Sequence, residues 1–125
     1  MKPFLDESKP IYLQIAEWIE DDILRDNLAE GEQVYSTNRF AKMFQINPAT
    51  AAKGINLLVE EGILFKKRGI GMFVADGAKK VIIDKRKQRF VQETVAELFQ
   101  EARKLGISRE ELLTLIKDYE GRESR

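Results

Sequence analysis

The segment LFKKRGIGMFV, residues 64–74, has three consecutive cationic side chains and two glycines between two apolar runs. The runs ILFK and MFVA are rich in aromatic and apolar side chains, and this composition predicts two strands. The residues KRGIG between them predict a turn, because Gly69 and Gly71 can adopt a positive φ at little cost. The segment is therefore predicted to form a β-hairpin with a basic tip.

Three roles are open to this hairpin: a phosphate-binding loop of an enzyme, a flexible loop without a specific role, or a basic finger that contacts nucleic acid. A phosphate loop leads from a strand into a helix and brings a lysine and a hydroxyl group after its glycines. Here a strand leads into a strand, and Gly71 is followed by no hydroxyl residue before Thr94. The elements that precede the hairpin favour the third role.

Two short helices are predicted before the hairpin. The first, residues 36–44, begins after Ser36 as its N-cap, and the second begins with Asn47 as N-cap and Pro48 as first helical residue. The second helix is expected to stop at Gly62. The turn of about three residues between them is typical of a helix-turn-helix. The side chains expected to face inward are Phe40, Ala41, Phe44, Ala51, Ile55 and Leu58.

A packed helical hairpin without DNA contacts would give a similar pattern. The small side chains early in the second helix favour the DNA-reading alternative, because they let a helix approach the floor of a groove. A helix-turn-helix followed at once by a basic-tipped hairpin is the winged helix arrangement. A further helix, residues 10–28, is expected to support this unit, since Glu17, Glu20, Asp21 and Asp22 give it an acidic outer face.

Charge and composition limit the classes of function that are possible for this chain. The net charge is zero, yet residues 63–89 hold nine Lys or Arg against two Asp or Glu, whereas residues 1–62 and 90–125 are net acidic. This excess is expected of a phosphate-binding face, although a solvated basic linker would show it too. Cysteine and histidine are absent, and the carboxylates form no catalytic constellation. No enzyme activity, cofactor or metal site is predicted.

The length of 125 residues indicates one domain with a small appendage. No apolar run approaches the roughly 20 residues of a membrane span, and the start MKPFLDESKP has no apolar signal core. We therefore expect a cytoplasmic protein without a membrane partner. The pattern indicates no dedicated ligand pocket, and no small-molecule effector is assigned.

The C-terminal part is predicted to be a helical hairpin that dimerises. Residues 77–83 are a predicted linker, and a helix is expected to resume near residue 84. Ser108 and Glu111 form a capping box for a last helix, and the tail after Tyr119 is expected to fray. Two helices alone cannot bury the apolar stripe between them, so a second copy of the chain is expected to cover it. The stripe consists of Val91, Val95, Leu98, Ala102, Leu105, Leu112, Leu113, Leu115, Ile116 and Tyr119.

The motifs PIYLQIAEWI, YSTNRFAKMF, INPATAAKGINLLVEEGIL and KKRGIGMFV occur in this order and spacing, and with them the chain resembles the GntR family of bacterial transcription regulators. The resemblance spans about residues 10–75 and, more weakly, 84–119. Within the family it resembles the YtrA-like subfamily. That resemblance implies a winged helix, a homodimer on a roughly palindromic operator, a two-helix dimerisation element in place of a metabolite-binding domain, and targets among transporter operons.

The resemblance carries over to individual positions. Ser36 matches the serine that opens the second family helix, Thr50 matches a threonine that usually contacts phosphate, and Lys53 matches a position that is often basic. Gly69 and Gly71 match the wing glycines.

The sequence departs from the family pattern at three positions. Asn38 replaces a family arginine, Arg39 stands where an acidic residue is common, and Ala52 stands where a basic residue is common. We therefore expect a base preference of its own.

Together these observations predict a mainly α fold with a small β-hairpin: a winged helix-turn-helix in residues 1–76, the linker 77–83, and a helical dimerisation hairpin in residues 84–125. The expected function is a dimeric, sequence-specific transcription regulator, as a repressor, on double-stranded DNA with a palindromic operator. Helix 48–61 would read bases, and a basic wing, residues 66–72, would contact the backbone. The expected DNA-binding residues are Ser36, Thr37, Asn38, Arg39, Asn47, Ala49, Thr50, Lys53, Lys67, Arg68, Gly69 and Gly71.

Several alternatives stay open at this point. Instead of contacting DNA, Lys53 could be an ordinary solvent-exposed lysine, and Arg39 could pair with an acid. For Lys66, a solubilising role at a strand edge is favoured over a DNA contact. The whole chain could also be a winged-helix module that binds a protein instead of specific DNA.

Overall fold

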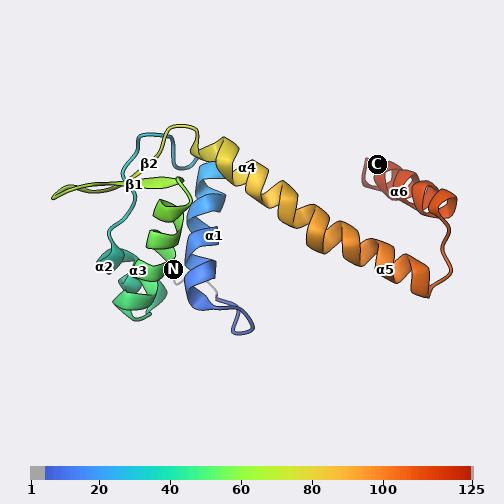
Figure 1. The fold of residues 1–125 in the computed structure, drawn as a ribbon, viewed down its shortest axis with the longest axis horizontal. Helices are drawn as coiled ribbons and strands as arrows, with labels where there is room; N and C mark the ends of the chain where they lie inside the picture. Colours follow the sequence, from blue (N-terminus) through green and yellow to red (C-terminus); the bar gives the residue numbers. More distant parts are fainter. Residues whose placement is uncertain (1–4, 125) are drawn as a thin grey trace. The chain divides into compact units, whose positions relative to one another are not determined.

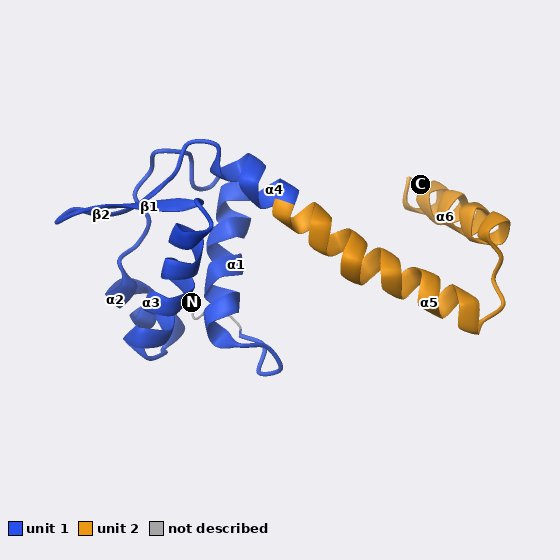
Figure 2. Ribbon diagram, viewed as in Figure 1, with its two compact units in different colours: residues 1–84 blue, residues 85–125 orange. Residues whose placement is uncertain are grey.

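The computed structural model describes residues 5–124, and the chain divides into two compact units, Met1–Asp84 and Lys85–Arg125 (Figure 2). The fold is mainly helical and contains one two-stranded antiparallel sheet, as predicted. The first unit contains α1 (Ile11–Leu24), α2 (Thr37–Phe44), α3 (Pro48–Glu60), β1 (Leu64–Lys67) and β2 (Gly71–Val74).

Within the first unit, α1 and α2 both pack against α3, and the β1–β2 hairpin projects away from the helices (Figure 1). The hairpin register pairs Leu64 with Val74 and Lys67 with Gly71. Every residue that the sequence predicted to face inward from the two short helices is buried. Trp18 contacts this core edge-on, with its ring centroid 5.8 Å from that of Phe40. The helix-turn-helix is thus held on α1 by a shared apolar core.

The contact between α1 and α3 requires a glycine. A Cβ added at Gly54 of α3 would lie 2.6 Å from the backbone oxygen of Tyr12 and 3.1 Å from the Cβ of Ile15. A real Cβ cannot approach a backbone oxygen so closely, and α1 would have to move. Gly54 therefore sets the distance at which α3 packs on its supporting helix.

We expect Gly54→Ala to destabilise the protein. Overpacking costs about 1–3 kcal/mol, which outweighs the gain of about 1 kcal/mol in helix propensity. Urea unfolding monitored by circular dichroism measures the difference. Gly121→Ala is the matched control, because a Cβ at Gly121 of α6 meets nothing within 4 Å. A Gly54→Ala protein as stable as this control would contradict the close packing.

Two predictions for the first helix are wrong. The helix ends at Leu24 instead of residue 28, because Asp26 takes a left-handed φ of 62° and the amide of Asn27 donates to the Asp22 carbonyl oxygen at 2.9 Å. The outer face is also less acidic than expected, since Glu20 is buried. Glu20 follows directly after the buried stripe residue Ile19, which places it at the edge of the apolar face.

The helix after the hairpin begins earlier than predicted. α4 spans Ala78–Arg89 and so includes most of the predicted linker. Ala78 and Ile82 are buried in the core of the first unit, and Lys79 pairs with Asp26 at 2.9 Å. The sequence analysis missed Ala78 and Ile82, which are one helical turn apart, because the basic residues around them indicated a solvated linker. An N-terminal fragment must therefore extend to Asp84 to retain its core.

The second unit begins within α4 and continues through η1 (Phe90–Val95), α5 (Ala96–Lys104) and α6 (Arg109–Glu123). The segment η1 is a π-helix within the stretch where the sequence predicted a helix. The Ser108 hydroxyl accepts a hydrogen bond from the Glu111 amide at 3.1 Å and caps α6, as predicted. The helix continues past Tyr119 to Glu123, so the expected fraying after Tyr119 is not found.

Candidate nucleic-acid interface

The two helices of the helix-turn-helix begin at side-chain caps. The Ser36 Oγ accepts a hydrogen bond from the Arg39 amide at 3.1 Å, and the Asn47 Oδ1 accepts one from the Ala49 amide at 2.8 Å. Between the helices Gln45 takes a left-handed φ of 55°, which reverses the chain. The predicted caps are confirmed. Each helix start also presents the positive end of its dipole, which favours phosphate.

The start of α3 is largely exposed. Asn47, Ala49 and Lys53 are exposed, and Thr50 is half-buried. Lys53 does not extend freely into solvent, because its Nζ lies 4.1 Å from the centroid of the Tyr12 ring. A hollow of about 550 Å³ beside them is lined by Tyr12, Ala49, Ala52, Lys53, Asn56, Leu57 and Glu60. Small side chains and one cation thus share this face of α3.

The start of α2 forms a neighbouring polar surface. Ser36, Asn38 and Arg39 are exposed, and Thr37 is half-buried. The Arg39 guanidinium carbon lies 4.1 Å from the centroid of the Tyr35 ring, so within the described part of the chain Arg39 stacks on an aromatic ring instead of pairing with an acid. Asn38, Arg39 and Lys42 of α2 line one hollow with Ile46 and Pro48. The starts of α2 and α3 therefore belong to one continuous surface.

The wing, residues 66–72, presents its cations to solvent. Lys66, Lys67 and Arg68 are exposed, and Gly69 has a positive φ of 77° at the turn. The Lys67 Nζ lies 4.4 Å from the centroid of the Phe73 ring, which orients the cation over the hairpin. The predicted glycine conformations are confirmed, and the turn carries exposed positive charge.

In the second unit, most of the predicted dimerisation residues are exposed. Val91 is 59% exposed and Leu105 70%, whereas Ala102 and Leu112 are buried within the unit. A groove of about 390 Å³ runs between α5 and α6. Its lining is almost entirely apolar and consists of Leu98, Glu101, Ala102, Leu105, Ile107, Leu112, Leu115, Ile116 and Tyr119. Large apolar side chains are rarely exposed in such numbers on so small a unit.

Three residues with a part in this surface were missed by the sequence analysis. Tyr12 and Tyr35 each hold one of the predicted DNA-binding cations by a ring face, and Gln33 contacts the wing. Tyr12 is 41 positions before Lys53, so periodicity along either helix could not relate the two. The tyrosines in the quoted motifs were the only available signal.

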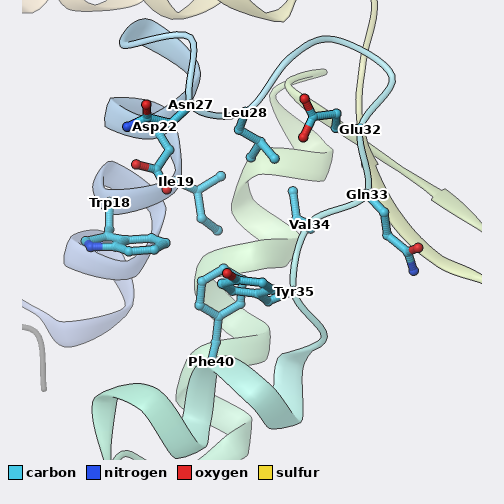
Figure 3. Close-up of a pocket in the computed structure, with 10 residues that line it drawn as sticks. All are labelled: Trp18, Ile19, Asp22, Asn27, Leu28, Glu32, Gln33, Val34, Tyr35 and Phe40. Carbon is cyan, nitrogen blue, oxygen red and sulfur yellow. The ribbon is translucent and has the colours of Figure 1, made fainter. Parts of the chain in front are cut away.

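A further hollow lies in the first unit between α1, the segment after it and α2 (Figure 3). The rings of Tyr35 and Phe40 lie together at one end, with the Trp18 ring of α1 beside them (Figure 3). Its volume of about 180 Å³ is below the roughly 300–1,000 Å³ of typical ligand pockets. The hollow is part of the packing that supports the start of α2.

Two searches of the described residues, 5–124, bear on other site classes. No helix among them combines the length and apolar character that crossing a membrane requires. No group of three or more Asp or Glu residues among them is arranged to hold a metal ion.

The arrangement of a helix-turn-helix with a basic wing corresponds to a known family. Residues 11–74 match the model of the bacterial regulatory proteins of the gntR family. The chain belongs to this family. The resemblance inferred from the motifs is therefore confirmed, and the winged helix is the DNA-binding fold of a transcriptional regulator. The similar proteins described below are named transcriptional regulators.

The similarity extends over the second unit as well. An uncharacterised HTH-type transcriptional regulator of Bacillus subtilis, YhcF, is 33% identical over 112 residues, which are 90% of this chain and 91% of YhcF. The HTH-type transcriptional repressor YtrA of Bacillus subtilis is 29% identical, over 89% of this chain and 85% of YtrA. Both relatives thus have nearly the same length as this chain.

Solved structures show the same fold. A crystal structure of a GntR-family regulator from Bacteroides thetaiotaomicron superposes with a TM-score of 0.78 at 36% identity, covering 90% of this chain and 98% of the other. S. agalactiae BusR, solved in complex with promoter DNA, superposes with a TM-score of 0.60 at 28% identity, covering 94% of this chain and 58% of BusR.

Proposed function

We propose that this gntR-family regulator is a homodimeric repressor that binds a palindromic operator. The exposed cationic and small side chains at the starts of α2 and α3, together with the basic wing, carry the proposal. The relative YtrA is named a repressor, and the structural neighbour BusR was solved with promoter DNA. We assign DNA binding to residues 1–84, whose core includes Ala78 and Ile82, and dimerisation to residues 85–125. Chromosomal DNA as target implies the bacterial cytoplasm as location.

In this proposal α3 reads bases and α2 holds the backbone. Asn47, Ala49, Thr50 and Lys53 would face the major groove, since the early part of the second helix approaches base edges in this motif. The helix starts at Ser36 and at Asn47 would attract phosphate. The other proposed phosphate contacts are Thr37, Asn38, Arg39, Lys67, Arg68, Gly69 and Gly71.

Dimerisation follows from the apolar surface of the second unit. The exposed residues Val91, Leu98 and Leu105 and the groove between α5 and α6 would be covered by the same surface of a second copy. A two-fold symmetric contact of this kind gives the dimer two identical DNA-binding units. Two half-sites of opposite orientation then make an inverted repeat, which is the operator that we propose.

The test is a selection of bound DNA from a random pool, followed by sequencing. The proposal expects enrichment of an inverted repeat whose halves are separated by a fixed spacing. A single enriched half-site would contradict the proposal that the protein binds its operator as a homodimer. No enrichment, together with no retention on a DNA column at low salt, would favour a winged helix that binds a protein through its exposed apolar residues.

The wing gives a separate expectation. We expect Lys67→Ala combined with Arg68→Ala to weaken binding to operator and random DNA alike, because backbone contacts are independent of sequence. The slope of log K against log salt should flatten by roughly one to two units per protomer. Fluorescence anisotropy titrations at several salt concentrations measure this slope. Lys117→Ala with Arg122→Ala, on α6, removes the same charge elsewhere and should leave the slope unchanged.

A further inference from the structure

Gln33 connects the segment before α2 to the tip of the wing. Its side-chain Nε2 donates a hydrogen bond to the Ile70 carbonyl oxygen at 3.0 Å, between positions 37 residues apart in the sequence. Ile70 lies in the turn of the hairpin, and its own amide donates to the Lys67 carbonyl oxygen at 3.0 Å. We propose that Gln33 is a positioning residue that fixes the wing tip for DNA binding. This inference rests on the proposed role of the wing.

The backbone brings Gln33 to this place. Residues 31–34 pair with β2 on the edge that β1 leaves open: the Gly31 amide donates to the Val74 carbonyl oxygen at 2.8 Å, and the Val34 amide donates to the Met72 carbonyl oxygen at 2.9 Å. Gln33 itself forms an antiparallel bridge with Phe73. After Val34 this backbone pairing stops, because the chain turns toward α2. The side-chain amide of Gln33 then supplies the next donor, which bonds to the Ile70 carbonyl oxygen nearer the tip of the hairpin.

The view of the neighbouring hollow agrees with this assignment. Gln33 lines the same hollow as Tyr35 and Phe40, and Figure 3 shows its side chain directed away from these two rings. Gln33 is exposed, so burial does not explain its orientation. The hydrogen bond to Ile70 explains the orientation, because it gives the side-chain amide a fixed partner on the hairpin.

Gly71 provides the room for this contact. It has a positive φ of 144°, and a Cβ at this position would lie 2.6 Å from the Gln33 Nε2. Any other residue at position 71 would have to displace the amide group or the backbone. The second wing glycine therefore serves two purposes: it closes the turn, and it leaves space for the side chain that holds the turn.

The wing needs such a support. Each strand of the hairpin has four residues, and a two-stranded hairpin alone is marginally stable in water. The proposed phosphate contacts are Lys67, the last residue of β1, and Arg68, the first residue of the turn. A tip that is ordered before binding loses less conformational entropy when it meets DNA. Removing one neutral hydrogen bond should reduce affinity roughly three- to tenfold.

The first readout requires no DNA. In the full-length protein, Gln33→Met keeps the length of the side chain but removes its donor. Hydrogen exchange at the Ile70 amide should accelerate in this variant, while exchange in α1 and α3 stays unchanged. Gln100→Met is the same replacement at an exposed position of α5, and it should change neither the exchange at the Ile70 amide nor the exchange in α1 and α3. Unchanged exchange at the Ile70 amide would overturn the positioning role, whatever the DNA titration shows.

The second readout is a double-mutant cycle on the selected operator. Gln33→Met should lose three- to tenfold in affinity in the wild-type background and little in the Lys67→Ala, Arg68→Ala background, because the tip then has no cations to position. An equal loss in both backgrounds would overturn the inference and indicate that Gln33 contacts DNA directly. If exchange accelerates but the Lys67→Ala, Arg68→Ala variant binds like wild type, the proposed wing contact with DNA fails while Gln33 still holds the tip.

Discussion

Replacing Leu98 and Leu105 by glutamate is expected to give a monomer that binds the selected operator roughly 10²–10⁴-fold more weakly. Both side chains line the apolar groove between α5 and α6, and Leu105 is the more exposed. Two carboxylates on this surface would have to be desolvated, beside their copies from the second chain, when a dimer forms. Loss of the dimer then turns binding of the second half-site from an intramolecular into an independent event.

The measurement combines sedimentation with an operator titration. Gln100→Glu adds one carboxylate to an exposed position of the same helix, two residues from Leu98 and so away from the groove, and should remain dimeric. Circular dichroism must show that the double variant keeps its helices. A wild-type chain that sediments as a monomer, or a double variant that remains dimeric with full operator affinity, would disprove the proposed role of this surface.

Much of the first unit was predictable because its signals are local. Ser36, Asn47 and Pro48 act within one helical turn, and each is found at the helix start that it predicted. Gly69 has the positive φ that the turn required. Caps, turns and apolar periodicity depend on neighbours in the sequence, so they can be recognised without knowing the fold.

Two of the missed contacts join distant segments: Lys53 meets Tyr12, and Gln33 meets Ile70. Neither pair has a spacing that a helix or a strand would mark. Arg39 meets Tyr35 only four positions away, but Tyr35 precedes the Ser36 cap and so lies outside the predicted helix. The early start of α4 was missed for a related reason, because its two buried residues contact the core of the first unit and are surrounded by lysines in the sequence.

The site predictions concern which side chains touch DNA, and Lys53 offers the sharpest test. We expect Lys53→Ala to weaken operator binding more than binding to random DNA. A base contact of good geometry contributes about 1–3 kcal/mol of discrimination, which is up to roughly a hundredfold in the ratio of the two affinities. A lysine that touched only phosphate would contribute equally to both. The ratio of affinities, more than either affinity alone, therefore reports what Lys53 does.

The geometry in the absence of DNA supports a reading role for Lys53. Its ammonium lies over the Tyr12 ring, next to the small side chains Ala49 and Ala52 on the exposed face of α3. A cation–π contact at an exposed site contributes about 0.5–1 kcal/mol, so the ammonium can leave the ring for a base edge at small cost. The ring therefore limits the conformations of the side chain without trapping it.

Anisotropy titrations of operator and random duplexes at one salt concentration measure the effect. Lys117→Ala, on α6, removes the same charge outside the proposed interface and should change neither affinity. Equal losses on both duplexes for Lys53→Ala would show a phosphate contact instead of a base contact. No loss on either would return Lys53 to an ordinary surface lysine, and the reading of bases would then fall to Asn47, Thr50 and Asn56, the polar side chains that remain on this part of α3 and at its cap.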